Sequence, residues 1–326
     1  MTAHAWVIGE GGLLGSAIRR AIERRDDWMV DARQSLPWND PAALRMAVAT
    51  RVRRLVTEAG AAGDDWVIIW AAGSAVTSTG GDELTAQLEQ FSAVLEEIES
   101  VARESHSRGS LFFSSSAGGL YGGSAHPPFD EDTEPIPVSE YGRAKLAMEL
   151  RVTEFGKRSG VSVLIGRIAN VYGPGQRITK PQGLISQLIL SHFTHRPAHI
   201  YVPLETTRNY IYVDDCARVT LACLDRLRAN ASRTQKAAPQ AVVKIIASRQ
   251  NLSIAVLLGY LRALGHRPAS VALGAIEPGA GQPIDLRLRS IVWTDLDLPD
   301  ETPIVVGFHA TLQGILTSLQ SPSRTG

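Results

Sequence analysis

The chain has 326 residues, of which 33 are basic, 33 are acidic and 44% are hydrophobic. The balanced charge excludes global steering toward nucleic acid or an anionic membrane, so any anion binding must be local. No apolar run reaches the roughly 18 residues that a membrane span needs, and we expect a globular protein with neither a membrane nor a nucleic-acid partner. The length suits one elaborated α/β unit or two domains.

Two further observations indicate the cytoplasm. The apolar stretch at residues 5–8 is too short for a signal peptide and runs straight into glycines. Cys216 and Cys223 fall in one predicted helix, where the helical rise puts their Cα atoms roughly 10 Å apart. That separation is too large for a disulfide, and free cysteines are typical of a reducing compartment.

The chain begins with a predicted strand, a glycine turn and a predicted helix. Residues 5–8 read as a short buried strand and residues 17–22 as an amphipathic helix, with G-x-x-G-x-x-G between them. In this context the first glycine permits a tight turn, the second lets the backbone approach a pyrophosphate, and the third lets the helix pack on the strand. The predicted cofactor contacts are Gly9, Gly12, Leu13, Leu14 and Gly15.

The second predicted strand, residues 28–32, should present the group that contacts the adenosine ribose. An acidic residue about twenty positions after the glycines binds the ribose 2′-hydroxyl, whereas an arginine there accommodates a 2′-phosphate. Asp31 and Arg33 offer both groups. The sequence therefore predicts NAD or NADP without separating them.

A helix over residues 41–58 leads to the continuous apolar run 66–73, which predicts a strand buried on both faces. The run ends in Ala71, Ala72 and Gly73, small residues that would let the cofactor lie against the end of the strand. The next helix, residues 82–105, carries an apolar stripe that suits a core or an interface.

The following strand ends in Ser114-Ser-Ser116 and precedes a glycine-rich turn and Tyr141-Gly-Arg-Ala-Lys145. Residues four apart on a helix share a face, so the phenol and the ammonium project side by side. A neighbouring ammonium favours the phenolate and can lower the pKa of a tyrosine. The pair can then act as a general acid or base, with a strand-end serine binding the same substrate oxygen.

Alternation of strands and helices continues through a strand at residues 161–167, after the helix that Gly160 ends. This pattern predicts a doubly wound parallel sheet, whose ligands bind at the carboxyl ends of its strands. We assign residues 1–174 to a dinucleotide-binding Rossmann domain, with returning segments near 209–246, and residues 175–326 mainly to a smaller substrate-binding domain. Later elements are predicted at 184–193, 199–202, 213–227, 242–246, 253–264 and 310–319.

Two other kinds of site are disfavoured. His192, His195 and His199 lie close in sequence, but no carboxylate or cysteine completes a metal site nearby, and a polar helix end is the simpler interpretation. No G-x-S-x-G nucleophile elbow is present. We predict no metal and no hydrolase chemistry.

Taken together, the motifs resemble those of extended short-chain dehydrogenases/reductases of the nucleotide-sugar epimerase/dehydratase family. The resemblance covers nearly the whole chain and rests on five motifs in the family's order. These are the Gly9–Gly15 turn, Ser114–Ser116 with Tyr121-Gly122, Tyr141-x-x-x-Lys145, the segment 167–176 beginning Arg-Ile-Ala-Asn170, and the segment 208–215 beginning Arg208-Asn-Tyr.

The resemblance implies a role for each matched residue. Tyr141 would be the catalytic acid/base, and Lys145 would bind the nicotinamide ribose and tune the phenol. Ser116 would orient the substrate hydroxyl, although the spacing to Tyr121-Gly122 also allows Ser115. The implied sugar-nucleotide contacts are Asn170, Arg208 and Arg287, with Arg289 as an alternative to Arg287. Relatives of this kind often form homodimers, here through residues 82–105 and 139–158.

Several positions depart from the family pattern. Trp70 stands where a histidine is usual, Gln87 where an asparagine is common, and Asn209 where an aspartate is usual after Arg208; residues 204–207 replace a Gly-Asp-Gly type of loop. These departures leave the identity of the sugar open. A non-catalytic dinucleotide-binding relative is the competing hypothesis, and retention of both the tyrosine and the lysine favours an enzyme.

The reaction can be narrowed from the residues after the catalytic serine. Dehydratases of the family carry an acidic pair there, whereas this chain has Ala117-Gly118-Gly119, which have no titratable side chains. We therefore predict a nucleotide-sugar epimerase that transiently oxidises a sugar hydroxyl with bound NAD(P). The alternative is an NAD(P)H-dependent keto-sugar reductase or dehydrogenase.

Overall fold

Apolar runs form the strands of one large parallel sheet. The computed structural model describes residues 1–73, 79–105, 107–176, 183–194, 196–233, 241–265, 271–274 and 283–320. In this part of the chain six strands pair in parallel in the order β2-β1-β3-β4-β5-β9. Their bounds are β1 Ala3–Ile8, β2 Trp28–Val30, β3 Asp65–Trp70, β4 Gly109–Ser116, β5 Ser162–Ile168 and β9 Ala241–Ile246. The predicted doubly wound α/β class is confirmed.

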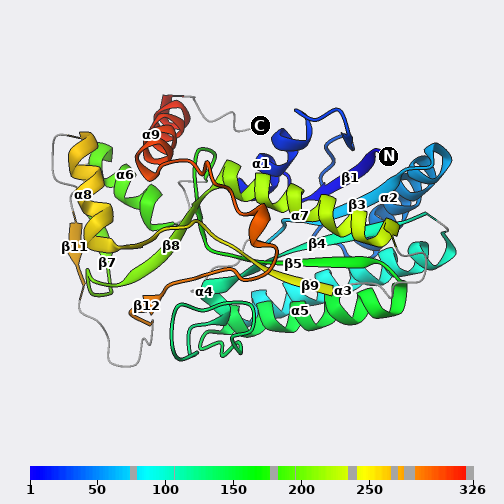
Figure 1. Cartoon of the computed structure of the whole chain (residues 1–326), viewed down its shortest axis with the longest axis horizontal. Helices are drawn as coiled ribbons and strands as arrows, with labels where there is room; N and C mark the ends of the chain where they lie inside the picture. The colour runs from blue at the N-terminus through cyan, green and yellow to red at the C-terminus, as the bar shows by residue number, and fades with distance from the viewer. Residues whose placement is uncertain are drawn as a thin grey trace.

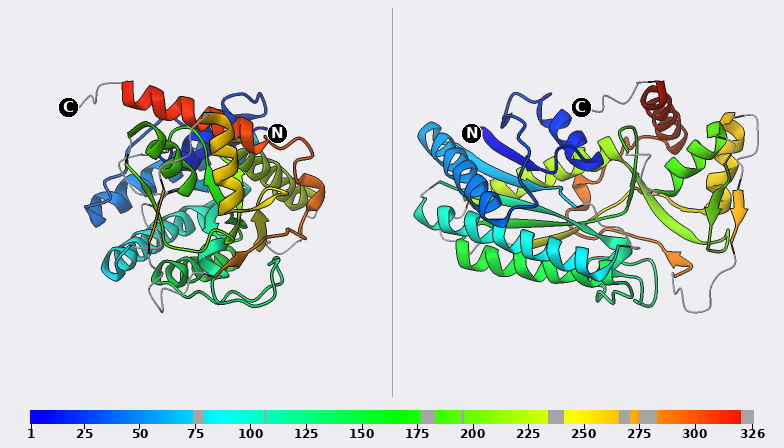
Figure 2. Two further views of the ribbon diagram at one scale, coloured as in Figure 1. Left: turned by 90° about the vertical axis from the view of Figure 1, so that its left-hand side faces the viewer. Right: turned by 180° about the vertical axis from the view of Figure 1, so that it is seen from behind.

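Helices cover both faces of this sheet (Figure 1). One face carries α1 and α7, which contact each other, and the other carries α2, α3 and α5, seen from behind in Figure 2. Each layer buries its own apolar core, around Ile18 and Leu224 on the first face and around Phe91 and Phe155 on the second. Burial on both faces explains why the central strands read as continuous apolar runs. The helices are α1 Leu13–Ile22, α2 Pro41–Ala62, α3 Gly81–Glu104, α5 Glu140–Ser159 and α7 Val213–Arg233.

A smaller region adjoins the carboxyl ends of the strands, at the left of Figure 1. Here β8 pairs in parallel with β6 and β12 and antiparallel with β10, and β7 pairs with β11. Leu188, Leu257 and Phe308 anchor its separate core. The elements are β6 Asn170–Tyr172, α6 Leu184–Thr194, β7 Ala198–Ile200, β8 Thr207–Tyr212, β10 Asn251–Ser253, α8 Ile254–Gly265, β11 Val271–Leu273, β12 Asp285–Leu286, the 3₁₀ helix η1 Thr294–Leu296 and α9 Ile304–Gln320.

Some element boundaries differ from the predicted ones. Helix α1 already begins at Leu13 because the glycine turn leads directly into its first turn, and α9 begins at Ile304 rather than near residue 310. Strands β6, β8, β10, β11 and β12 were not predicted. All of them except the six-residue β8 have only two or three residues, which are too few to show an alternating pattern. Gly160, with φ of 77°, ends α5 as predicted.

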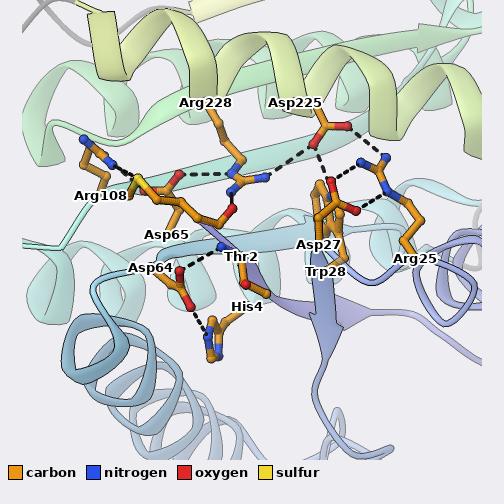
Figure 3. Close-up of polar contacts among 11 residues, drawn as sticks. Thr2, His4, Arg25, Asp27, Trp28, Asp64, Asp65, Arg108, Asp225 and Arg228 are labelled. Atoms are coloured by element: carbon orange, nitrogen blue, oxygen red, sulfur yellow. Dashed lines mark hydrogen bonds and ion pairs between the residues drawn. The ribbon is translucent and has the colours of Figure 1, made fainter.

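A polar network fastens α7 to the amino ends of the strands (Figure 3). Asp65 accepts hydrogen bonds from Arg108 Nε at 3.0 Å and from Arg228 Nε at 3.1 Å. Asp225 accepts one from Trp28 Nε1 at 3.0 Å. These contacts lie at the edge of the sheet opposite the glycine turn, so they stabilise the scaffold without entering the candidate site.

Three expectations from the sequence can be compared with the fold: they concern membrane spans, the two cysteines and a dimer interface. Within the described residues, no helix combines the length and apolar character needed to cross a membrane. Cys216 and Cys223 lie buried and free on α7, as predicted. The apolar stripe of α3, including Phe91 and Ile98, is buried inside the monomer, so it no longer supports a dimer interface.

Candidate functional site

The glycine turn after β1 folds closely against the end of β3. Gly9 has φ of +92°, and a Cβ atom there would lie 2.5 Å from the Ala72 amide nitrogen. A Cβ atom on Gly15 would lie 2.3 Å from the Gly9 carbonyl oxygen, which also accepts the Gly12 N–H at 2.9 Å. Sterics therefore require glycine at the first and third positions.

The N-terminus of α1 opens onto this turn. Gly12 is its N-cap residue and provides no side-chain hydrogen bond to the first N–H groups. A helix N-terminus of this kind binds an anionic diphosphate through its unpaired N–H groups and its dipole. Leu13 and Leu14 are half-buried and pack against the core below. The residues present thus fit the diphosphate of a dinucleotide.

The end of β3 lies beside the turn. The Ala71 N–H donates to the Ile8 carbonyl at 2.8 Å, so the two strands remain paired up to the glycine turn. Ala71 and Ala72 are half-buried and Gly73 is exposed. The strand end thus presents small residues beside the glycine turn, and their contact with a cofactor stays a prediction.

Asp31 follows β2 at the same edge, but it is not free. Its carboxylate forms ion pairs with Arg51 and Arg54 of α2, and only 11% of its side chain is exposed. Glu10, inside the glycine turn, accepts the Gln34 N–H at 3.1 Å. The segment that would surround the adenosine ribose is therefore fixed by contacts from both the turn and α2.

Arg33 lies in this segment and is exposed. Together with Arg51 and Arg54 it makes the surroundings of Asp31 strongly basic. Sequence reasoning found Asp31 and Arg33 but missed the two arginines of α2, because no spacing rule links residue 31 to a helix that starts ten positions later.

Ser116 and Tyr141 meet at the end of β4. Ser116 caps the short helix α4 (Ala117–Leu120), its Oγ accepting the Gly119 N–H at 3.2 Å. Tyr141 lies in the first turn of α5, where the Ser139 Oγ accepts the Gly142 N–H at 3.1 Å and fixes the start of the helix. The Ser116 side chain works against the effect of burial on the pKa of the Tyr141 phenol. The two side chains lie together beside Gly119, where a Cβ atom would be 3.0 Å from the Tyr141 ring and 3.4 Å from the Ser116 Oγ.

The choice between the two serines now has a structural basis. Neighbouring strand residues face opposite sides of a sheet, so Ser115 lies on the side of Phe113, which packs into the core that includes α5. The Ser116 side chain, in contrast, is the one that acts on the Tyr141 phenol. Ser115 is buried, and its hydroxyl has no hydrogen-bond partner among the described residues. Ser116 is therefore the serine that the fold brings to Tyr141.

Lys145 lies one turn further along α5, with its side chain directed to β4. Its Nζ donates to the Ser114 carbonyl at 3.0 Å and lies 5.1 Å from the centre of the Phe113 ring and 5.9 Å from that of Tyr141. Burial lowers the pKa of Lys145 to about 8, against the opposing effect of Glu149.

Burial raises the pKa of Tyr141, and the Ser116 side chain opposes this effect. The Lys145 ammonium donates to the Ser114 carbonyl, and its effect on the pKa of Tyr141 stays a prediction.

The candidate substrate residues lie where the sheet meets the smaller region. Asn170 donates from Nδ2 to the Asn209 carbonyl at 2.9 Å. Arg208 donates from Nη1 to the Thr207 carbonyl at 2.9 Å, and burial lowers its pKa. Arg287 is instead paired with Asp285 at 2.8 Å, and the exposed Arg289 lies 3.8 Å from a carboxylate oxygen of Asp130.

The departures from the family pattern have structural explanations. Trp70 is buried, with its ring 4.8 Å from that of Phe91, so it fills the core. Asn209 is also buried and holds the neighbouring loop: its Nδ2 donates to the Ser248 carbonyl at 2.9 Å, and its Oδ1 accepts the Ser248 N–H at 2.9 Å. Gln87 donates from Nε2 to Glu83 at 3.2 Å.

The predicted absence of a metal can be examined only in part. His195 and the side chain of His192 lie outside the described residues. Among the residues that are described, no three His, Cys, Asp or Glu side chains are grouped so as to hold a metal ion.

Comparison with known proteins decides the family. The model of the NAD dependent epimerase/dehydratase family matches residues 5–236. The chain belongs to this family. It is 33% identical over 115 residues to a dTDP-4-dehydro-6-deoxyglucose reductase of Escherichia coli, and 31% identical over 115 residues to a putative UDP-glucose 4-epimerase of Methanocaldococcus jannaschii. Each match covers 35% of this chain, and 36% and 38% of the two relatives, so the chain spans little more than a third of their length.

Solved structures of this family share the whole fold. A UDP-glucuronic acid 4-epimerase from Bacillus cereus, solved with UDP-glucuronic acid and NAD, gives a TM-score of 0.73 over 97% of this chain and 99% of its own, at 22% identity. A UDP-glucose 4-epimerase from Thermotoga maritima, solved with UDP-glucose, gives 0.74 over 97% and 100%, at 17% identity.

Substitution of two glycines separates packing from cofactor binding. We expect Gly15→Ala to lower the melting temperature and to abolish dinucleotide binding, because its Cβ would overlap the Gly9 carbonyl. Gly12→Ala is the matched control: its Cβ would lie 3.3 Å from the same oxygen, a contact that small shifts relieve. It should leave the melting temperature nearly unchanged while weakening NAD binding. Thermal unfolding and calorimetric titration measure both, and normal NAD affinity in both variants would contradict the site.

Proposed function

We propose that this protein is a nucleotide-sugar epimerase that oxidises a sugar hydroxyl transiently with bound NAD and reduces the resulting ketone from the other face. The observation that carries the proposal is the contact between the Tyr141 phenol and Ser116, with Lys145 beside it, at the end of a strand next to a dinucleotide turn. Relatives named as 4-epimerases among both the curated proteins and the solved structures support it.

The chemistry of each residue follows from its contacts. Tyr141 would take the proton of the sugar hydroxyl during oxidation and return it during reduction, while Ser116 holds the same oxygen by a hydrogen bond. Lys145 would keep a positive charge beside the phenol and the nicotinamide ribose. NAD, when bound, supplies the hydride acceptor, and the glycine turn with the open N-terminus of α1 would hold its diphosphate.

Elimination of water is disfavoured by the space around the tyrosine. A Cβ atom on Gly119 would lie 3.0 Å from the Tyr141 ring, so no acidic side chain fits there without displacing the ring. Ala117 is buried and apolar, and Gly118 is exposed. Position 118 could accommodate a side chain, since nothing lies within 4 Å of a Cβ there, but the chain provides none.

Among the arginines, Arg208 is the strongest candidate for the diphosphate of the sugar nucleotide. Among the described residues, its hydrogen bonds go to the backbone carbonyls of Thr207 and Ile284 rather than to a carboxylate. Arg287 would have to leave Asp285 first. An arginine fork matches a diphosphate well, and we propose that the smaller region, including β8 and β12, forms the sugar-nucleotide site.

The reaction is tested by incubating the purified protein with UDP-, GDP- and dTDP-sugars while following the absorbance of reduced nicotinamide. Product isomers without net change in cofactor are expected. Stoichiometric oxidation of NAD(P)H with a keto-sugar would instead identify a reductase, the activity named for the E. coli relative. Binding of neither dinucleotide would contradict both.

Single substitutions at the strand end test the catalytic roles. Tyr141→Phe should lower kcat by roughly 10²–10⁴-fold, because a positioned acid/base is lost, while NAD binding persists. Ser116→Ala should lower kcat in the same direction. Ser115→Ala is the matched control and should retain near-normal turnover, because the Ser115 hydroxyl is buried and has no hydrogen-bond partner among the described residues. Near-normal turnover of Tyr141→Phe would exclude the assignment.

We propose that Asp31 selects NAD by accepting the ribose 2′-hydroxyl, held in place by Arg51 and Arg54. Asp31→Ala should weaken NAD binding and strengthen NADP binding, because three basic side chains, Arg33 among them, then face the 2′ position without an opposing charge. Titration of both dinucleotides measures the ratio of affinities. Adding Arg33→Ala to this variant should reduce the gain in NADP affinity, and an unchanged ratio in Asp31→Ala would contradict the proposal.

We further propose a homodimer through the outer faces of α3 and α5. Leu150 on α5 is 63% exposed, and α5 presents exposed Arg143 and Arg151 where α3 presents exposed Glu89 and Glu96. Leu150→Glu should therefore give a monomer by light scattering at micromolar concentration. Val306→Glu, at an equally exposed apolar position on α9, should remain dimeric, and a monomeric wild-type protein would exclude the interface.

A further inference from the structure

A buried chain of charged and polar groups runs from behind the catalytic lysine to the neighbouring strand. Arg167 of β5 donates to Glu149 of α5 from Nε at 3.2 Å to both carboxylate oxygens and from Nη2 at 2.8 Å. Its Nη1 donates to the Tyr121 hydroxyl at 2.8 Å, and that hydroxyl donates to the Asp130 carbonyl at 2.9 Å. The side chains of Arg167 and Glu149 are only 8% and 5% exposed.

This ion pair has a definite direction with respect to the site. Glu149 is four residues after Lys145 on α5, so the two side chains lie on the same face of the helix. Arg167 is held on the far side of the carboxylate by Tyr121, whose ring is 5.4 Å from the guanidinium carbon. The negative end of the pair is therefore nearer to Lys145, and the positive end is nearer to Tyr121.

A buried ion pair of this kind needs a reason beyond stability. Removing two charges from water costs about as much as their attraction returns, and apolar replacements are often equally stable. Within the described part of the chain, every donor to the Glu149 carboxylate comes from Arg167. The pair thus holds one carboxylate rigidly, at the helical position that acts on the catalytic lysine.

We propose that Glu149, fixed by Arg167 and Tyr121, is a positioning residue that keeps the Lys145 ammonium charged inside the site. This inference rests on the proposed function for its catalytic meaning, but the charge state of Lys145 can be measured without any substrate.

The groups around Lys145 support this role. From α5, Glu149 favours the ammonium and Tyr141 places its ring nearby; from β4, the Ser114 carbonyl accepts a hydrogen bond and the Phe113 ring offers its face. From β5, Arg167 acts as a like charge behind the carboxylate. Burial lowers the pKa of Lys145 to about 8, and Glu149 is the charged residue that opposes this effect.

Removal of the Glu149 charge should lower the pKa of Lys145. A lysine is charged below its pKa, and removing a nearby negative charge lowers that pKa. In Glu149→Gln the ammonium should therefore be lost at a pH about 1 unit lower than in the wild type. The high-pH limb of kcat/KM should move down by the same amount, and a smaller fraction of the enzyme would carry the charge at neutral pH.

The direct test is the pH dependence of acylation of Lys145 by an amine-selective reagent, followed by mass spectrometry of its peptide. The wild type should become half-reactive near the pKa of about 8, and Glu149→Gln at a pH about 1 unit lower. Glu99→Gln is the matched control: it removes a carboxylate of α3 that is paired with Arg158 of α5 at 2.8 Å, and it should leave the midpoint of Lys145 unchanged.

Two outcomes would overturn the proposal. One is an unchanged Lys145 midpoint in folded Glu149→Gln, even if the variant is less stable or less active, since a purely structural role predicts that result. The other is an equal shift in Glu99→Gln. If Glu149→Gln does not fold because Arg167 is left unpaired, the double variant Glu149→Gln/Arg167→Gln removes both charges, and its midpoint should still fall, by a smaller amount. Because the reagent reports Lys145 itself, failure to find a sugar-nucleotide substrate leaves this test intact.

Discussion

The parallel direction of the six strands is the constraint on which the rest of the structure depends. Because every strand points the same way, the glycine turn after β1, the small residues after β3 and the serines of β4 all meet at one edge. The opposite edge is occupied by ion pairs such as Asp65 with Arg228. The candidate binding site and the stabilising ion pairs are thus at opposite ends of the strands, as expected for open α/β sheets.

Burial is the main cause of the pKa shifts of Tyr141 and Lys145 at that end of the sheet. Burial raises the pKa of Tyr141 and lowers that of Lys145, so both groups are pushed toward their neutral forms. The Ser116 side chain and the Glu149 carboxylate oppose these effects from different elements. The protonation of these two groups therefore depends on side chains outside the tyrosine–lysine spacing, including the buried pair of Glu149 and Arg167.

Local patterns in the sequence predicted the sheet, the covering helices and the pairing of Tyr141 with a strand-end serine, because periodicity and glycine turns are short-range signals. Those patterns could not identify Arg51 and Arg54 around Asp31, or the diversion of Arg287 to Asp285, because such contacts depend on tertiary packing. Glu149 could have been identified from the sequence, because it follows Lys145 at the same four-residue spacing that separates Lys145 from Tyr141. The choice of Ser116 over Ser115 depended on the tertiary placement of the Tyr141 phenol, which strand alternation alone does not give.

The central claim is that oxidation and reduction form a closed cycle at Tyr141, with the hydride kept by the bound cofactor. The most direct measurement follows a sugar nucleotide deuterated at the carbon that changes configuration, with unlabelled protein and solvent. A closed cycle predicts an epimer that retains deuterium at that same carbon, with no net gain of reduced cofactor. Loss of the label to water, or its accumulation on released cofactor, would contradict the account.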